Sequence, residues 1–267
     1  MLIDILPVWA LFLVSVALVM LSLEVGFRMG FTVRRKTEDE RESPASAISG
    51  VILGLQAFML AFTFGIVSDR YDTKKGLVRE EANTIRTAFQ RSDFLLEPDQ
   101  AKTKALLQEY VDQRLAVAQS HDANFALNSL GESLRMQQEL WDMAVANGRI
   151  DNSDIAALYV DSVNEISRIH ATRVGLGLHA RIPTTIWIVL LSLLILGMVG
   201  VGYHTAIADS RRSRVAPILA ISFSLVVALI AALDHPGDTL MPVSQQPLVN
   251  VQSEMKTASS LGALNTP

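Results

Sequence analysis

Residues Gly50–Asp72 carry the stretch GVILGLQAFMLAFTFGIVSDRYD, which decides the fold class of this chain. Positions 50–68 contain no Asp, Glu, Lys or Arg, and the next four residues contain three of them. A helix needs about 20 apolar residues to cross the hydrocarbon core of a bilayer. The stretch therefore predicts a membrane-spanning helix that ends close to Ser68.

This charge-free stretch extends back to Ser43, and three further stretches also lack charged residues. They are Ile5–Leu23, Ile182–Ala208 and Val215–Leu233. Of the 267 residues, 50 % are hydrophobic and 19 % are charged, whereas a soluble domain carries about 25 % charge. We therefore exclude a single soluble domain and predict an all-α integral membrane protein with four transmembrane helices. The leader before Ile5 has no Lys or Arg, so we expect a retained helix there rather than a signal peptide.

The spacing of these stretches predicts four parts. They are a first transmembrane hairpin at residues 1–68, a helical extramembrane domain at 69–181, a second transmembrane hairpin at 182–234 and a C-terminal tail at 235–267. The chain past Leu240 is rich in Ser, Gln, Thr and Pro, which is typical of a loose tail.

The central domain contains signals for several helices. Tyr71–Phe94 holds no Pro and one Gly, so we expect it to continue the second span as helix. Pro98 followed by Asp99 predicts a helix break and restart. Further along, Gly148 after an Asn predicts a helix end, and Ser153 predicts the cap of a last long helix.

Basic residues in the short loops predict the orientation in the membrane. Residues 28–41 hold five Lys or Arg, and the loop between the third and fourth spans holds Arg211, Arg212 and Arg214. The positive-inside rule places both loops in the cytoplasm. We therefore predict a multi-pass protein of the cell (inner) membrane with both termini and the central domain outside.

The second span carries an apolar stripe along one helix face. Leu55, Phe58, Phe62 and Ile66 fall at i, i+3, i+7 and i+11. Repeated around an oligomer axis, such a stripe would narrow a pore and gate it by dewetting. The alternative is that these side chains contact lipid or a neighbouring helix.

Basic residues follow this span directly. Arg70, Lys74 and Lys75 are candidates for a positive ring at a pore mouth. The alternative is an interfacial anchor, helped by Tyr71 at the headgroup level.

Two pieces of the chain resemble the signature of the bacterial bestrophin-like family. They are Leu60–Asp72 with Leu77–Asn83 after it, and the later run Leu233–Pro236, where the family usually has Arg at the position of His235. The resemblance extends over about residues 10–248. The residues that carry it are Asp69, Tyr71, Asp72, Glu80, Glu81, Asn83, Asp234 and Pro236.

The resemblance implies an assembly and a transported species. Bestrophins are pentameric anion channels with four spans per subunit, and their second membrane helix lines the pore and carries a hydrophobic neck. By similarity, Phe58, Phe62 and Ile66 would face the axis of a homo-pentamer that passes inorganic anions. The resemblance places the central domain in the cytoplasm, whereas the short-loop charges place it outside, and we follow the charges.

Other chemistries find little support in the sequence. The chain has no cysteine, and its five histidines show no metal-ligand spacing, so we expect no metal and no cofactor. We find no nucleophile elbow or phosphate loop and expect no enzyme. The net charge of −4 argues against nucleic-acid binding. Glu24 and Arg28 are spaced for a structural ion pair, and the glycines between 197 and 202 for close helix packing.

Two hypotheses remain for the function. The first is an oligomeric channel, with anions as the expected ions and the second span as the pore lining. The second is a membrane-anchored scaffold or sensor whose extramembrane helices bind a protein partner without ion conduction. In either case, Glu80, Glu81 and Asn83 could bind a cation or pair with Arg79 and Arg86 between subunits. Ordinary helix-surface pairing at i, i+3 and i+4 explains these residues as well.

Overall fold

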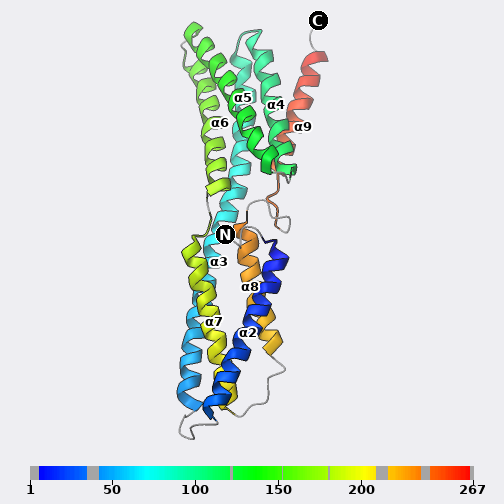
Figure 1. Cartoon of the computed structure of the whole chain (residues 1–267). Helices are drawn as coiled ribbons and strands as arrows, with labels where there is room; N and C mark the ends of the chain where they lie inside the picture. Colours follow the sequence, from blue (N-terminus) through cyan, green and yellow to red (C-terminus); the bar gives the residue numbers. More distant parts are fainter. Residues whose placement is uncertain are drawn as a thin grey trace. The chain divides into compact units, whose positions relative to one another are not determined.

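The computed structural model describes residues 6–34, 42–120, 123–151, 153–179, 181–208, 216–235 and 241–264. Within these residues the chain is helical and contains no strand. The elements are α2 (Val8–Arg34), α3 (Glu42–Arg91), the short 3₁₀ helix η1 (Ser92–Phe94), α4 (Asp99–Gln119), α5 (Ala123–Ile150), α6 (Asp154–His179), α7 (Thr184–Ile207), α8 (Ala216–Asp234) and α9 (Gln246–Leu264) (Figure 1). Four of them, α2, α3, α7 and α8, are long and apolar enough to cross a membrane, which confirms the predicted class.

The chain divides into two compact units. The membrane unit comprises Met1–Tyr71 and Arg181–Met241, and the second unit comprises Asp72–Ala180 and Pro242–Pro267. Helix α3 is continuous from Glu42 to Arg91, and its residues up to Tyr71 belong to the membrane unit and those from Asp72 on to the second unit. The prediction that the stretch after Tyr71 continues the second span as helix is therefore confirmed.

Glycines bring α2 and α7 close together in the membrane unit. A Cβ added at Gly26 would overlap the backbone of Val199, and one at Gly202 would overlap the backbone of Leu23. Lipid tails are as apolar as leucine, so membrane helices associate largely through such close packing of small residues. The predicted packing role of the glycines between 197 and 202 is therefore confirmed.

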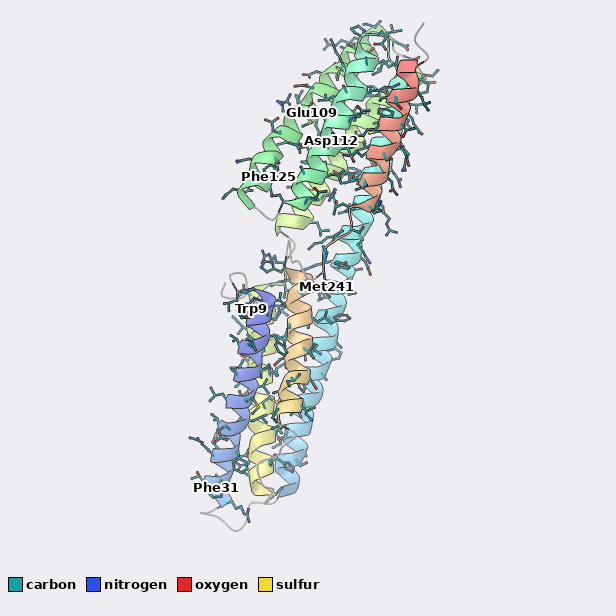
Figure 2. The ribbon with its side chains drawn as sticks, turned by 90° about the vertical axis from the view of Figure 1, so that its right-hand side faces the viewer. Trp9, Phe31, Glu109, Asp112, Phe125 and Met241 are labelled. Atoms are coloured by element: carbon teal, nitrogen blue, oxygen red, sulfur yellow. The ribbon has the colours of Figure 1, made fainter. Side chains whose placement is uncertain are left out.

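A single apolar core joins the four long helices of the membrane unit. Its buried side chains include Val19 and Leu23 of α2, Leu60 of α3, Trp187, Leu190, Leu194 and Met198 of α7, and Ile230 of α8. Figure 2 shows Trp9 and Phe31 near opposite ends of α2, where both side chains are exposed, as expected for aromatic residues at the two interfaces of a bilayer. The predicted ion pair is also present, with 2.8 Å between Arg28 Nε and Glu24 Oε1.

The second unit has a core of its own. Its buried residues come from the last part of α3, from α4, α5 and α6, and from α9, with Ile85, Leu107, Tyr110, Leu140, Tyr159, Ile166 and Leu248 among the most deeply buried. The restart at Asp99 and the Ser153 cap are confirmed, the latter by a 3.3 Å bond from Ala156 N–H to Ser153 Oγ. The stop signal at Gly148 lies two residues before the observed end of α5 at Ile150.

The expectation of a loose tail after Leu240 is also wrong for the residues that the structure describes. Residues 246–264 form α9, which lies on α4. Leu248, Val251 and Met255 recur at i, i+3 and i+7 and are buried in the core of the second unit. The polar composition of this segment concealed a narrow apolar stripe, so the second unit is larger than the predicted central domain.

Candidate functional site

The predicted apolar stripe lies on the outer surface of the membrane unit. Leu55, Phe58 and Phe62 are about half to two thirds exposed, at 49 %, 65 % and 58 %, whereas Ile66 is half-buried. The rings of Phe58 and Phe62 stack with their centroids 6.4 Å apart. The membrane unit therefore presents a continuous apolar surface on α3 that its own core does not use.

The inward face of α3 holds a different set of residues. Gln56, Leu60, Thr63 and Val67 are buried, at the 3- and 4-residue spacing of one helix face. At 100° per residue, the centre of this face lies about a third of a turn around the helix from the centre of the stripe of Leu55 and its neighbours. The Thr63 hydroxyl bonds the Met59 carbonyl at 2.7 Å, so it serves its own helix rather than a neighbour.

Three glycines of α3 differ from those of α2 and α7. A Cβ added at Gly50, Gly54 or Gly65 would meet no atom within 4 Å. By contrast, Gly26 and Gly202 lie against the backbone of a neighbouring helix in the membrane unit. The small residues of α3 thus form an exposed flank beside the apolar stripe.

The two sequence pieces that carry the family resemblance meet at one end of the membrane unit. Asp234, the last residue of α8, is 8 % exposed, and its Oδ1 accepts the Ile182 backbone N–H at 2.9 Å. The same oxygen lies 3.6 Å from Nη1 of Arg70 on α3. One carboxylate therefore joins Arg70 of α3 and the end of α8 to Ile182, two residues before α7. Pro236 lies outside the described residues.

The other residues around this end have local roles. Tyr71 packs against the apolar core of the membrane unit. In the second unit, Lys75 pairs with Asp72 at 2.7 Å. The predicted mouth residue Arg70 is engaged with Asp234, so its charge also holds the helix ends together.

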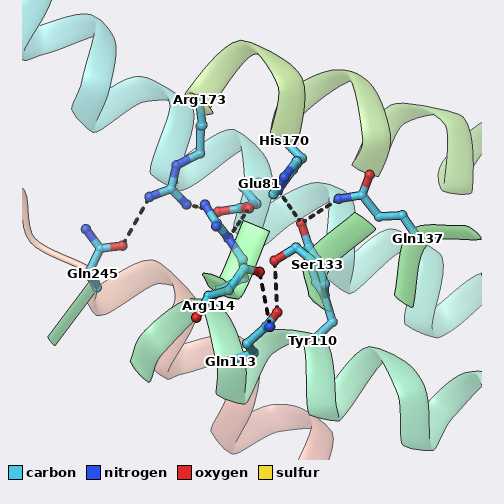
Figure 3. Close-up of polar contacts among 10 residues, drawn as sticks. Glu81, Tyr110, Gln113, Arg114, Ser133, Gln137, His170, Arg173 and Gln245 are labelled. Carbon is cyan, nitrogen blue, oxygen red and sulfur yellow. Dashed lines mark hydrogen bonds and ion pairs between the residues drawn. The ribbon is translucent and has the colours of Figure 1, made fainter. Parts of the chain in front are cut away.

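Glu81 is the centre of the most polar cluster in the second unit. Its side chain is fully buried, and Arg114 Nε on α4 lies 3.0 Å from its Oε1. Arg173 on α6 pairs with its other oxygen. Figure 3 shows both guanidinium groups directed at Glu81. The idea that Glu81 is an ordinary helix-surface residue is therefore wrong, because an ion-pair cluster encloses it.

The neighbouring motif residues lie on the surface. Glu80 accepts a 2.8 Å bond from Arg168. Asn83 accepts one from Arg86 at 2.8 Å, and Arg86 also binds both carboxylate oxygens of Glu254 on α9, at 2.6 and 3.0 Å. These pairs connect α3 with α6 and with α9.

Neutral polar side chains surround the Glu81 cluster (Figure 3). The Tyr110 hydroxyl lies 3.1 Å from His170 Nδ1, and Gln137 Nε2 donates to that hydroxyl at 3.3 Å. Burial, together with the charge of Arg114, lowers the pKa of His170 to about 4. Burial also raises the pKa of Tyr110. Both groups are therefore neutral at pH 7.

Burial also acts on the two arginines. It lowers the pKa of Arg114, against a smaller opposing effect of Tyr110, and it lowers the pKa of Arg173 to about 10. Arg173 therefore still carries its charge at pH 7, and the Arg114 guanidinium pairs with the Glu81 carboxylate. Sequence reasoning missed this cluster, although Tyr110 and Arg114 interrupt an apolar face of α4 at helical spacing, which was a usable signal.

No group of three or more metal-ligating side chains occurs among the described residues.

The profile of the Bestrophin-like domain matches residues 12–248, which is nearly the whole chain. The chain therefore belongs to the Bestrophin-like family, as the signature residues implied. It is a membrane protein by its four long apolar helices. Neither the curated proteins nor the solved structures contain a match to it.

Proposed function

We propose that this protein is a subunit of a homo-oligomeric membrane channel that passes inorganic anions along the outer face of α3. The family match and the four long apolar helices support a membrane channel subunit. The observation that carries the proposal is the surface of α3 itself. Leu55, Phe58 and Phe62 face away from the subunit core, and the Gly50, Gly54 and Gly65 flank has no neighbour within the subunit.

Each face of α3 then has a partner. The buried face holds the subunit together, the small-residue flank lets a neighbouring copy approach closely, and the apolar stripe faces the shared axis. A ring of phenylalanines and leucines narrows the water path and opens or closes by wetting. Ile66, which is half-buried, completes the neck at the Ser68 end. By family resemblance the oligomer is a pentamer.

Anion preference comes from charge near the neck rather than in it. Arg70, Lys74 and Lys75 concentrate anions at the mouth of the path. The protein lies in the inner membrane, and the positive-inside rule places its short basic loops in the cytoplasm. In this orientation the second unit and both termini lie outside the cell. Arg211, Arg212 and Arg214, which support this orientation, lie outside the described residues.

Chloride flux from liposomes tests the proposal. Liposomes with the purified protein should lose chloride faster than empty ones, and Phe62→Ala should raise the rate by widening the neck. Leu55→Ala and Leu13→Ala form a matched pair, because both leucines are about half exposed on apolar helices but only Leu55 lies on the stripe of α3. Equal flux from protein and empty liposomes would refute conduction.

The second candidate is a membrane-anchored scaffold, and one observation favours it. The second unit has its own buried core, which is what a partner-binding domain requires. In this case the α3 stripes pack against one another or face lipid, and neither Phe62→Ala nor Leu55→Ala changes ion flux. Particle images that place α3 on the lipid side of an oligomer would also support it over the channel.

A further inference from the structure

The buried cluster of the second unit contains more positive than negative charge. Among its described residues, the charged side chains that are buried or nearly so are Glu81 at 0 %, Arg114 at 9 % and Arg173 at 16 % exposed. Two guanidiniums therefore share one carboxylate. His170 and Tyr110 beside them are neutral and add no negative charge.

An excess charge in a protein interior is unfavourable because water screens it poorly there. The usual remedy is a second counter-charge or a change of protonation. Arginine keeps its proton in proteins, so deprotonation does not remove the excess. A monovalent anion next to a guanidinium balances the charge and accepts its N–H groups.

Arg173 is the place where such an anion can bind. It is the more exposed of the two arginines, and besides Glu81 it contacts only a neutral acceptor among the described residues, Gln245 Oε1, at 3.4 Å from its Nη2. That distance is long for a charged donor. The Gln245 amide is itself held by a 2.8 Å bond from its Nε2 to the Val243 carbonyl, so its oxygen stays beside Arg173.

We propose that Arg173, backed by Arg114 and Glu81 and bordered by Gln245, forms a binding site for a small monovalent anion such as chloride. The anion binds at the outer edge of the Arg173 guanidinium and stabilises the packing of α3, α4 and α6 around Glu81. The site lies in the second unit and is separate from the proposed pore. It makes the stability of this unit depend on the identity of the anion and not only on ionic strength.

Hydrogen exchange of the full-length protein in detergent tests the site without a conduction step. Samples are compared in sodium chloride and in sodium gluconate at equal ionic strength, and exchange is followed in the α6 segment 163–176. At about 150 mM chloride and a Kd of tens of millimolar, the exchange rate should fall about four- to eight-fold, since protection scales with one plus the ligand-to-Kd ratio. Equal rates in the two salts would overturn the proposal.

Two variants separate specific binding from general salt effects. Arg173→Gln should abolish the chloride effect, whereas Arg168→Gln, on the exposed side of the same helix, should retain it. Gln245→Glu places a carboxylate beside Arg173, so it should give high protection in gluconate and no further gain in chloride. If chloride protects Arg173→Gln or Gln245→Glu as well as it protects the native protein, the site is refuted. Because the assay involves no ion flux, its outcome does not depend on whether the channel proposal holds.

Discussion

Replacing Glu81 with glutamine removes the buried carboxylate that two arginines share. At a charge separation of about 4 Å and an effective dielectric constant of about 20, each pair contributes about 4 kcal/mol of Coulomb energy. Removing one partner of a buried pair costs about 3–5 kcal/mol in measured systems, because the remaining charges lose their counter-ion. Glu81→Gln should therefore lower the free energy of unfolding of the second unit by at least about 3 kcal/mol.

The neighbouring Glu80 provides a matched control. It also pairs with an arginine, Arg168, at 2.8 Å, but both side chains are about half exposed. Exposed pairs contribute about 0–1 kcal/mol, so Glu80→Gln should change stability by less than about 1 kcal/mol. The assay is native-state hydrogen exchange of the full-length protein in detergent, followed in the α4 segment 103–115.

The result that would refute this reasoning is an equal loss for the two glutamine variants. A further variant checks the assigned cause. Replacing Glu81 with Leu and both Arg114 and Arg173 with Met removes all three charges at once. It should recover most of the stability that Glu81→Gln loses, since apolar replacement of a buried ion cluster is often neutral or stabilising.

Three other predictions concern the packing and the buried histidine. Folding lowers the pKa of His170 from an ordinary 6.5 to about 4, so as the pH falls the unfolded chain binds this proton before the folded protein does. The free energy of unfolding should therefore fall by at most about 3 kcal/mol between about pH 6.5 and pH 4. In urea titrations at several pH values, a His170→Gln variant should show a shallower pH dependence. Gly26→Ala should destabilise the membrane unit by about 1–3 kcal/mol because the new Cβ overlaps Val199. Gly54→Ala, whose new Cβ meets no atom of the chain, should not destabilise the protein in detergent, and similar losses for the two variants would contradict the packing. Asp234→Ala should lower the free energy of unfolding by about 1–3 kcal/mol, because the Ile182 N–H loses its acceptor and Arg70 loses its counter-charge. Asp234→Asn keeps an acceptor and should lose less, so equal thermal unfolding of the two variants would argue against the helix-end role.

Local signals predicted much of the architecture because they act over one or two turns. The charge-free lengths indicated all four long apolar helices, and Pro98 and Ser153 marked helix starts that the structure confirms. The stop signal at Gly148 lies only two residues before the observed end of α5, since Arg149 and the exposed Ile150 still belong to the helix. A glycine raises the energy of a helix by only about 1 kcal/mol, so it marks the region of a helix end better than the exact residue.

The site was less accessible to sequence reasoning. The stripe of Leu55, Phe58 and Phe62 was found by its period, yet periodicity alone does not say which side of a helix faces the subunit core. Glu81 was found through the family signature, but its partners Arg114 and Arg173 come from helices far away in the sequence. The α9 stripe was hidden in a polar segment.

The sequence alone determined that this chain is a helical membrane protein. Transferring charge into hydrocarbon is very unfavourable, so charge-free apolar stretches of about 20 residues are typical of membrane-spanning helices. The sequence also determined the family, through a short signature near the end of the second span. Only the tertiary structure decided that Glu81 is enclosed by two arginines, that α9 completes the second unit and that α3 turns Phe58 and Phe62 outward. These features depend on contacts between distant segments, and no local pattern specifies which segments will meet.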